Sequence, residues 1–270
     1  YNYITSLTVP DGIKTVGAGA FAGCGVIEAV RFGKDLTSVG SDAFLDDYSI
    51  SQVFAADIVS WAKIDFGNPT ANPMYYPCGL ILGNDEIIEL VLPDRSDVTK
   101  VGSYAFTNCI MLANIVIPDS VNTIGVGAFY GCSGLESITL PFVGDSKSAT
   151  TASKTTVFGH VFGSSNYMGS IAVNQSVGTY YIPELLTYVN ITGGNILDYA
   201  FYGCSMLTEI ILPEKTQSVN TIGTSAFYGC TGLSEITIPG SINRINNNAF
   251  QNCNNIEVVN ISNLANWITM

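Results

Sequence analysis

A unit of 23 residues recurs along this chain and restricts it to folds in which similar rows stack on one another. The dipeptide Ala-Phe marks the unit: three of its six intervals are 23 residues long, and the others are 26, 62 and 72. It occurs at 20–21, 43–44, 105–106, 128–129, 200–201, 226–227 and 249–250. A repeat of this length cannot bury its apolar face alone, so the pattern predicts a solenoid whose neighbouring rows share one core.

The best-preserved unit, LANIVIPDSVNTIGVGAFYGC at 112–132, indicates what each row contains. Its first six residues alternate and include β-branched side chains, which predicts a short strand. Pro118 has no N–H to donate and ends that strand. The rest of the unit predicts a turn and then a short helical or 3-10 segment that carries Ala128 and Phe129.

The position before the repeated cysteine holds only two residue types, Gly and Asn. These are the residues that tolerate a positive φ most easily. The six occurrences are Gly23, Asn108, Gly131, Gly203, Gly229 and Asn252. We therefore expect a left-handed residue at this point of every row.

Three units carry a family signature: LANIVIPDSVNTIGVGAFYGC, MLTEIILPEKTQSVNTIGTSAFYGC and GLSEITIPGSINRINNNAFQNC. Their shared order of strand, Pro, VxxIG, Ala-Phe and Gly-Cys or its equivalent resembles the BspA-like leucine-rich repeats of bacterial and protozoan surface proteins. The resemblance covers nearly the whole chain. It implies a secreted or cell-surface protein that binds host matrix proteins or other cells, without common catalytic residues. The chain departs from the pattern at 45–49, where LDDYS replaces the Gly-Cys pair.

The repeats and the resemblance together predict one α/β solenoid domain over residues 1–270. We expect a right-handed, leucine-rich-repeat-like stack of about ten rows, with short parallel strands on one side and short helical or 3-10 segments opposite. Two insertions, at about 57–83 and 142–183, interrupt the rows. We also expect that the chain is part of a longer one, because VNISNLANW at 259–267 echoes VFAADIVSW at 53–61.

Charged residues are scarce and mostly acidic, with 10 Lys and Arg against 22 Asp and Glu and a net charge of −12. Nucleic acids and anionic membranes are bound through clustered basic residues, so this balance argues against both as partners. No apolar run approaches the roughly 18 residues that a transmembrane helix needs. The acidic charge favours a partner with basic patches.

Six of the seven cysteines share one repeat position, which predicts a ladder of small buried thiols. They are Cys24, Cys109, Cys132, Cys204, Cys230 and Cys253. Disulfides remain an alternative, since a secreted protein meets oxidising conditions. No CxxC pair or Cys/His cluster has the spacing of a zinc site, so we expect neither a metal nor a cofactor.

Cys78 and His160 are the residues from which a nucleophilic Cys-His pair would be built. They lie 82 residues apart in different insertions, and no catalytic motif surrounds either of them. The simpler interpretation is a loop cysteine and a surface histidine. The sequence therefore predicts a protein that is not an enzyme.

The two insertions contain the candidate ligand-binding residues. Long loops on a rigid scaffold often carry binding sites, and Tyr and Trp combine a large contact area with a polar group. The candidates are Trp61, Tyr75, Tyr76, Tyr167, Tyr180 and Tyr181. The alternative is that these side chains pack the insertions onto the solenoid, which the hairpin-like alternation at 157–162 and 178–183 favours.

The leading hypothesis is a non-enzymatic, monomeric, secreted or cell-surface module for adhesion. It would bind a protein or glycan ligand on host extracellular matrix or on a cell surface. The alternative is a structural spacer that displays another domain, and a hydrolase that uses the second insertion is a third hypothesis. Exposed aromatic patches on the insertions would favour binding, whereas packed insertions and a uniformly polar strand face would favour the spacer.

Overall fold

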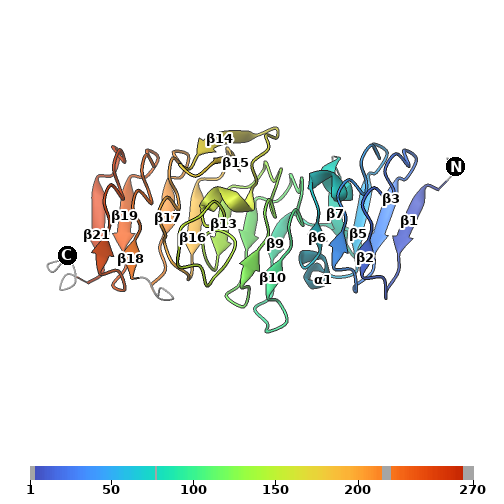
Figure 1. The fold of residues 1–270 in the computed structure, drawn as a ribbon, viewed down its shortest axis with the longest axis horizontal. Coiled ribbons are helices and arrows are strands. Elements are labelled where there is room, and N and C mark those ends of the chain that lie inside the picture. Colours follow the sequence, from blue (N-terminus) through green and yellow to red (C-terminus); the bar gives the residue numbers. More distant parts are fainter. Residues whose placement is uncertain (1–3, 77, 215–219, 264–270) are drawn as a thin grey trace.

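The computed structural model describes residues 4–76, 78–214 and 220–263, and it shows an elongated solenoid of about 11 turns (Figure 1). Each row begins with one strand of a parallel ladder. These first strands are β1 (Ser6–Val9), β3 (Ala29–Phe32), β5 (Gln52–Ala55), β7 (Gly79–Leu82), β9 (Glu89–Val91), β11 (Asn114–Val116), β13 (Ser137–Leu140), β16 (Tyr188–Ile191), β17 (Glu209–Ile211), β19 (Glu235–Ile238) and β21 (Val258–Ile261). The stacked-repeat fold predicted from the sequence is confirmed.

A second series of two-residue strands follows the loops after the first strands. It comprises β2 (Thr15–Val16), β4 (Ser38–Val39), β6 (Asp65–Phe66), β10 (Lys100–Val101), β12 (Thr123–Ile124), β18 (Thr221–Ile222) and β20 (Arg244–Ile245). We call the side formed by the post-strand loops and these second strands the loop edge. The segments that run from each second strand to the next first strand form the turn edge.

The repeat sets the register of the parallel ladder. Ile115 of β11 lies opposite Leu90 of β9 and Ile138 of β13, and all three side chains are buried. The Phe of each Ala-Phe pair stacks along the same axis. Ring centroids are 6.0 Å apart for Phe106 and Phe129 and 5.3 Å apart for Phe201 and Phe227. A 23-residue period therefore places each apolar side chain on its equivalent in the next row.

The segments opposite the first strands are turns, so the predicted helical or 3-10 segments at Ala-Phe are not found there. In the first row, Gly19, Phe21 and Gly23 donate their N–H groups to carbonyls of the next row. Only the alternate N–H groups, such as those of Ala20 and Ala22, close turns within the row. A helix would need every N–H for its own bonds, and the row-to-row bonds prevent this.

The left-handed position before the cysteine is confirmed in all six rows for which it was predicted. Its φ angles lie between 53° at Asn108 and 76° at Gly131. A second left-handed position precedes the Ala of each pair. Its residues are Gly19, Asp42, Tyr104, Gly127, Tyr199, Ser225 and Asn248.

All seven cysteines are free thiols, and four of the six ladder cysteines are buried. Cys132 and Cys230 donate to the carbonyl oxygens of Phe106 and Phe201, each at 3.1 Å. Burial raises the pKa of Cys132 to about 12, so the thiol stays protonated and can donate this hydrogen bond. The expectation of burial is wrong for Cys24, which is exposed in the first row.

The LDDYS segment places a carboxylate in this ladder. The N–H of Asp47 bonds to the carbonyl of Phe44 just as that of Cys24 bonds to Phe21, so Asp47 occupies the cysteine position. Asp46 takes the left-handed position with a φ of 64°. The Asp47 side chain is fully buried, and neither of its oxygens has a hydrogen-bond partner among the described residues.

Both insertions complete rows as well as projecting from them. They contain α1 (Ile58–Ala62), the 3-10 helices η1 (Pro69–Ala71), η2 (Pro73–Tyr75) and η3 (Phe158–Val161), and the hairpin of β14 (Ser170–Asn174) and β15 (Thr179–Pro183); β8 (Asp85–Glu86) follows the first insertion. The N–H of Phe44 donates to Thr70, and that of Phe129 donates to Val161. The insertions therefore supply the row-to-row bonds that an Ala-Phe turn supplies elsewhere.

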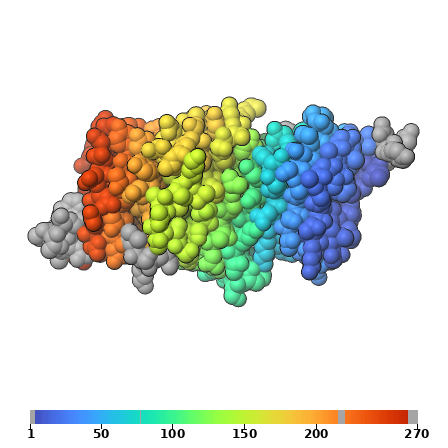
Figure 2. Space-filling view, viewed as in Figure 1, coloured from blue at the N-terminus to red at the C-terminus, as the bar shows by residue number. Residues whose placement is uncertain are grey.

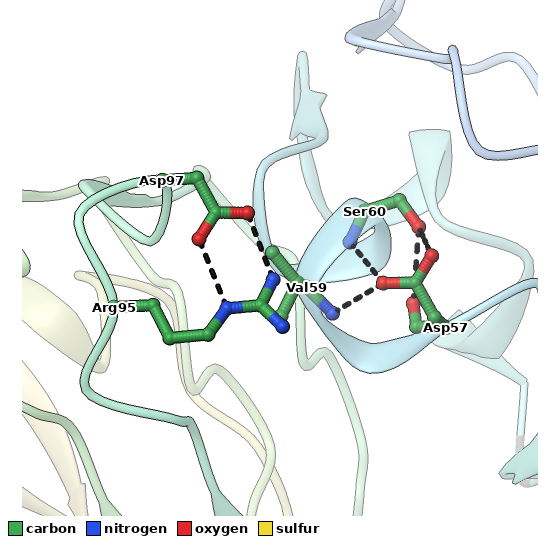
Figure 3. Close-up of polar contacts among 5 residues, drawn as sticks. All are labelled: Asp57, Val59, Ser60, Arg95 and Asp97. Carbon is green, nitrogen blue, oxygen red and sulfur yellow. Dashed lines mark hydrogen bonds and ion pairs between the residues drawn. The ribbon is translucent and has the colours of Figure 1, made fainter.

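In Figure 1 the hairpin β14–β15 lies at the upper edge, and α1 lies at the lower edge. Asp57 caps α1: its Oδ1 accepts from the N–H groups of Val59 and Ser60, both at 2.9 Å (Figure 3). Within the described ranges, no helix is long and apolar enough to span a bilayer. The echo of the first insertion at 259–267 lies partly outside the described residues.

Candidate functional site

Two of the predicted binding residues are packed into the molecule. Trp61 is 1% exposed, and its indole N–H donates to the carbonyl of Ala105 at 2.8 Å. Tyr180 is 6% exposed, and its hydroxyl donates to the carbonyl of Lys154 at 2.6 Å. For these two side chains the packing interpretation fits the structure better, and we leave them out of the candidate site. Tyr181 is half-buried in β15, where its N–H donates to Gly163.

Two other predicted residues, Tyr75 and Tyr167, both line a groove on the turn edge. The groove has a volume of about 440 Å³. It lies between the first insertion, which provides Tyr75, and the second, which provides Asn166 to Met168. Its lining comprises Tyr75, Asn108, Ile110, Tyr130, Gly131, Ser133, Asn166, Tyr167 and Met168. The structure thus brings together residues that are 92 positions apart in the chain.

Short-range contacts fix both walls of the groove. Asn72 accepts from the N–H of Met74 at 2.9 Å and donates to the carbonyl of Tyr104 at 2.8 Å, which holds η2 against the solenoid. On the other wall, the hydroxyl of Tyr130 donates to the carbonyl of Asn166 at 3.1 Å. The ring of Tyr130 meets that of Tyr167 edge-on, with centroids 5.1 Å apart. The groove is therefore largely preformed.

The lining side chains are neutral at physiological pH. Burial raises the pKa of Tyr167 and that of Tyr130, so both phenols keep their protons. The hydroxyl of Tyr167 is buried and lacks a hydrogen-bond partner among the described residues. The groove can contribute aromatic contact, apolar burial and amide hydrogen bonds, and it does not offer a titrating acid or base.

A second aromatic group adjoins the groove; we call it the tyrosine cluster, and it consists of Asp46, Tyr48, Tyr75 and Tyr76. The rings of Tyr48 and Tyr76 meet edge-on at 4.9 Å, and those of Tyr75 and Tyr76 at 5.4 Å. Tyr48 donates its hydroxyl to Asp46 at 2.6 Å, and the N–H of Asp46 donates to the hydroxyl of Tyr76 at 2.7 Å. Tyr75 belongs to both the cluster and the groove lining.

Sequence reasoning missed Tyr48, Ile110, Tyr130 and Met168, although two signals pointed to all of them except Tyr130. Tyr48 and Ile110 both directly follow the cysteine position of their rows, where other rows have small or polar residues. Met168 is an apolar residue in a stretch rich in Ser, Asn and Gly. In the structure Met168 is 90% exposed and Tyr48 is 71% exposed.

The residues considered for catalysis do not provide an activated nucleophile. Burial raises the pKa of Cys78 to about 12, and its Sγ lies 3.8 Å from the carbonyl oxygen of Pro73. His160 is buried in η3, contrary to the expected surface position, and burial lowers its pKa. A protonated thiol is a poor nucleophile. Among the described residues, no three His, Cys, Asp or Glu side chains form a group that could hold a metal ion.

Comparison with known proteins places the chain in a family. The model of the BspA type leucine rich repeat region matches it with six copies, over residues 1–65, 83–179 and 178–269. The unmatched stretch falls within the first insertion. No curated protein matches the chain.

Solved structures of similar architecture come from several bacteria. A leucine rich cell surface protein from Faecalibacterium prausnitzii is 17% identical, with 98% of this chain and 90% of that one covered and a TM-score of 0.34. A leucine-rich repeat protein from Bacteroides ovatus is 24% identical, with coverage of 94% and 78% and a TM-score of 0.34. A leucine rich repeat protein from T. pallidum is 20% identical, with coverage of 88% and 80% and a TM-score of 0.33. These likenesses are weak, and the assignment rests on the family model: the chain belongs to the BspA type leucine rich repeat family.

Proposed function

We propose that this chain is an extracellular, cell-surface or secreted adhesion module that binds a protein ligand through its turn edge. The proposed contact surface combines the groove and the tyrosine cluster. The observation that carries the proposal is a run of exposed apolar side chains along this edge, which the fold does not need. Membership of a family that includes cell-surface repeat proteins supports the location.

Four of the exposed large apolar residues belong to the groove, to the tyrosine cluster or to the position next to Ile110. Tyr48, Ile110, Met111 and Met168 all rank among the large apolar side chains with high exposure. Ile110 and Met168 line the groove, and Tyr75 connects it to Tyr48. Clustered exposed apolar residues mark interaction sites, whereas apolar residues exposed singly are normal on a protein surface.

A structural spacer would not require an exposed apolar surface on the turn edge. The packed parts of the insertions, such as Trp61, would suit either a spacer or a binding module. Met168 at 90% exposure is different, because it packs against little and lies at the rim of a preformed groove. We further propose that the module acts as a monomer, since a net charge of −12 opposes self-association.

The test is biolayer interferometry of the chain against host matrix proteins, mucin-type glycans and bacterial cells. Two variants accompany the native chain. The double substitution Ile110→Ser with Met168→Ser removes apolar contact from the groove. The matched control is Ile211→Ser with Val258→Ser, which replaces exposed apolar residues of β17 and β21. We expect saturable binding to a protein that only the groove variant loses.

The other outcomes are equally definite. Equal loss in both variants would move the site away from the groove. Binding to glycans alone would replace a protein ligand by a carbohydrate. Absence of binding to all three classes would favour the spacer.

A further inference from the structure

The two edges of the solenoid differ in charge. The turn edge consists of residues 17–28, 40–51, 67–78, 102–113, 125–136, 197–208, 223–234 and 246–257. In the row of the second insertion, which has no named second strand, it is counted as 157–187, from the segment that accepts the hydrogen bonds of Gly127 and Phe129 in the preceding row. These segments contain eight acidic residues and not one Lys or Arg. Eight of the nine described basic residues lie instead on the loop edge: Lys14, Lys34, Lys63, Arg95, Lys100, Lys147, Lys154 and Arg244.

The basic residues of the loop edge are partly paired there. Arg95 forms a bidentate ion pair with Asp97, donating from Nε at 3.0 Å and from Nη2 at 2.8 Å (Figure 3). Lys100 contacts Asp65 directly. All three ion pairs found among the described residues are on this edge. The acidic residues of the turn edge therefore have no basic side chain of their own edge to neutralise them.

The tyrosine cluster adds a site of suitable chemistry to this acidic edge. Asp46 is exposed and is joined to Tyr48 and Tyr76 by two hydrogen bonds, of 2.6 and 2.7 Å. The bond to Asp46 raises the pKa of Tyr48, so the ring stays neutral beside the carboxylate. A carboxylate next to aromatic rings attracts a cation both by its charge and through the ring faces.

Arginine is the cation that fits such a site best. Its planar guanidinium stacks on aromatic rings and forms a fork of donors for a carboxylate, whereas lysine offers a strongly hydrated point charge. The chain uses this pairing elsewhere: the guanidinium carbon of Arg31 lies 3.6 Å from the ring centre of Phe54 on the strand face.

From these observations we infer that the ligand of the turn edge is a cationic polypeptide segment that combines arginine with apolar side chains. An arginine lies against Asp46, Tyr48 and Tyr76, and a neighbouring apolar side chain enters the groove beyond Tyr75. This inference rests on the proposed function and names the chemistry of its partner. The continuity of the cluster with the groove through Tyr75 allows one short segment to reach both.

Three fluorescein-labelled peptides test the inference by fluorescence anisotropy. They repeat Gly-Arg-Gly-Leu, Gly-Glu-Gly-Leu or Gly-Arg-Gly-Ser three times. We expect saturable binding of the Arg-Leu peptide that weakens as NaCl is raised, with weaker binding of the Arg-Ser peptide and none of the Glu-Leu peptide.

Matched variants separate the site from the general field of an acidic protein. Asp46→Asn and Asp35→Asn change the net charge equally, one in the cluster and one on the loop edge. We expect Asp46→Asn and Tyr48→Leu each to weaken Arg-Leu binding about three- to fivefold, and Asp35→Asn to leave it within about twofold. Circular dichroism and thermal melting verify that the variants fold.

Several results would overturn the inference. These are equal effects of Asp46→Asn and Asp35→Asn, binding of the Glu-Leu peptide as tightly as the Arg-Leu peptide, or no saturable Arg-Leu binding up to about 1 mM. The proposed function is judged separately, because the Ile110 and Met168 variant changes no charge. Loss of protein binding in that variant alongside failure of the peptides would leave the binding module intact and remove only its cationic ligand.

Discussion

Asp47 offers a direct way to test how the ladder position stabilises the fold. At this position, three other rows carry a thiol that donates a hydrogen bond to a carbonyl, as Cys132 does to Phe106. An ionised carboxylate cannot donate, and its charge is buried away from water. Burial accordingly raises the pKa of Asp47 from 3.8 to about 6. Protonated Asp47 supplies an O–H where the ladder otherwise supplies an S–H.

The raised pKa sets both the size and the sign of the effect. The folded chain binds the Asp47 proton more tightly than the unfolded chain, so the stability from protonation is complete below about pH 4 and is lost as the pH rises through about 6. Each pH unit between the two pKa values is worth about 1.4 kcal/mol. Ionisation of Asp47 between these limits therefore lowers the free energy of unfolding by about 3 kcal/mol.

Asp47→Asn removes the titration while it keeps the size of the side chain. We expect the variant to be more stable than the native chain by up to about 3 kcal/mol at pH 7.5. That difference should shrink steadily toward pH 4. Urea unfolding followed by tryptophan fluorescence across this range measures it, since Trp61 is buried in the next row.

Asp35→Asn is the matched control, because it removes one exposed carboxylate that lies outside the ladder and is not next to Asp47 in the chain. Asp47→Cys restores the ladder and should also be more stable than the native chain at pH 7.5. A stability difference between Asp47→Asn and the native chain that does not vary with pH would refute the reasoning. A less stable variant at pH 7.5 would do the same.

Three further predictions concern the stacked rows. Phe129→Ala removes a fully buried ring from the core, so urea unfolding should show a loss of about 3–5 kcal/mol. Native protein treated with a thiol reagent should be labelled at Cys24, whereas the buried ladder thiols should react only after unfolding, as peptide mass spectrometry would show; these are Cys109, Cys132, Cys204 and Cys230. Gly125→Ala would place a Cβ 2.3 Å from the backbone nitrogen of Ser103, and calorimetry should show a lower melting temperature from a loss of about 1–3 kcal/mol.

The rows could be predicted because the repeats within this one sequence can be compared with one another. Six occurrences of only Gly or Asn before the cysteine were enough to locate a left-handed residue in each row. The second left-handed position gave no such signal, since it holds Gly, Asp, Tyr, Ser and Asn. At Tyr104 the conformation is held from outside, by the bond from its N–H to the carbonyl of Val126 in the next row. Single-residue preferences do not contain that information.

The same limit explains why turns were mistaken for helical segments. Ala128 and Phe129 sit in a stretch whose composition allows a 3-10 turn. The choice between helix and turn depends on where the N–H of Phe129 goes, and it goes to Val161 in the second insertion. A partner 32 residues away decides the local structure.

The candidate site was only half predictable. Aromatic enrichment correctly drew attention to the insertions, but it could not separate Trp61, which enters the core, from Tyr75, which lines the groove. That separation depends on which carbonyls each insertion meets: the indole N–H of Trp61 reaches Ala105. The groove itself exists only because both insertions fold toward the same edge.

The charge difference between the edges is a stronger sign of recognition than the aromatic content, because the fold does not require it. The turn edge has exposed positions, such as Ala22, Ser49 and Thr231, at which a lysine would extend into solvent. Surface substitutions at such positions change stability by no more than about 0.5 kcal/mol. The loop edge accepts lysine at equally exposed places. Nine segments without one basic residue are therefore better explained by what the turn edge meets than by how it folds, and a cationic ligand accounts for their charge and for the exposed tyrosines together.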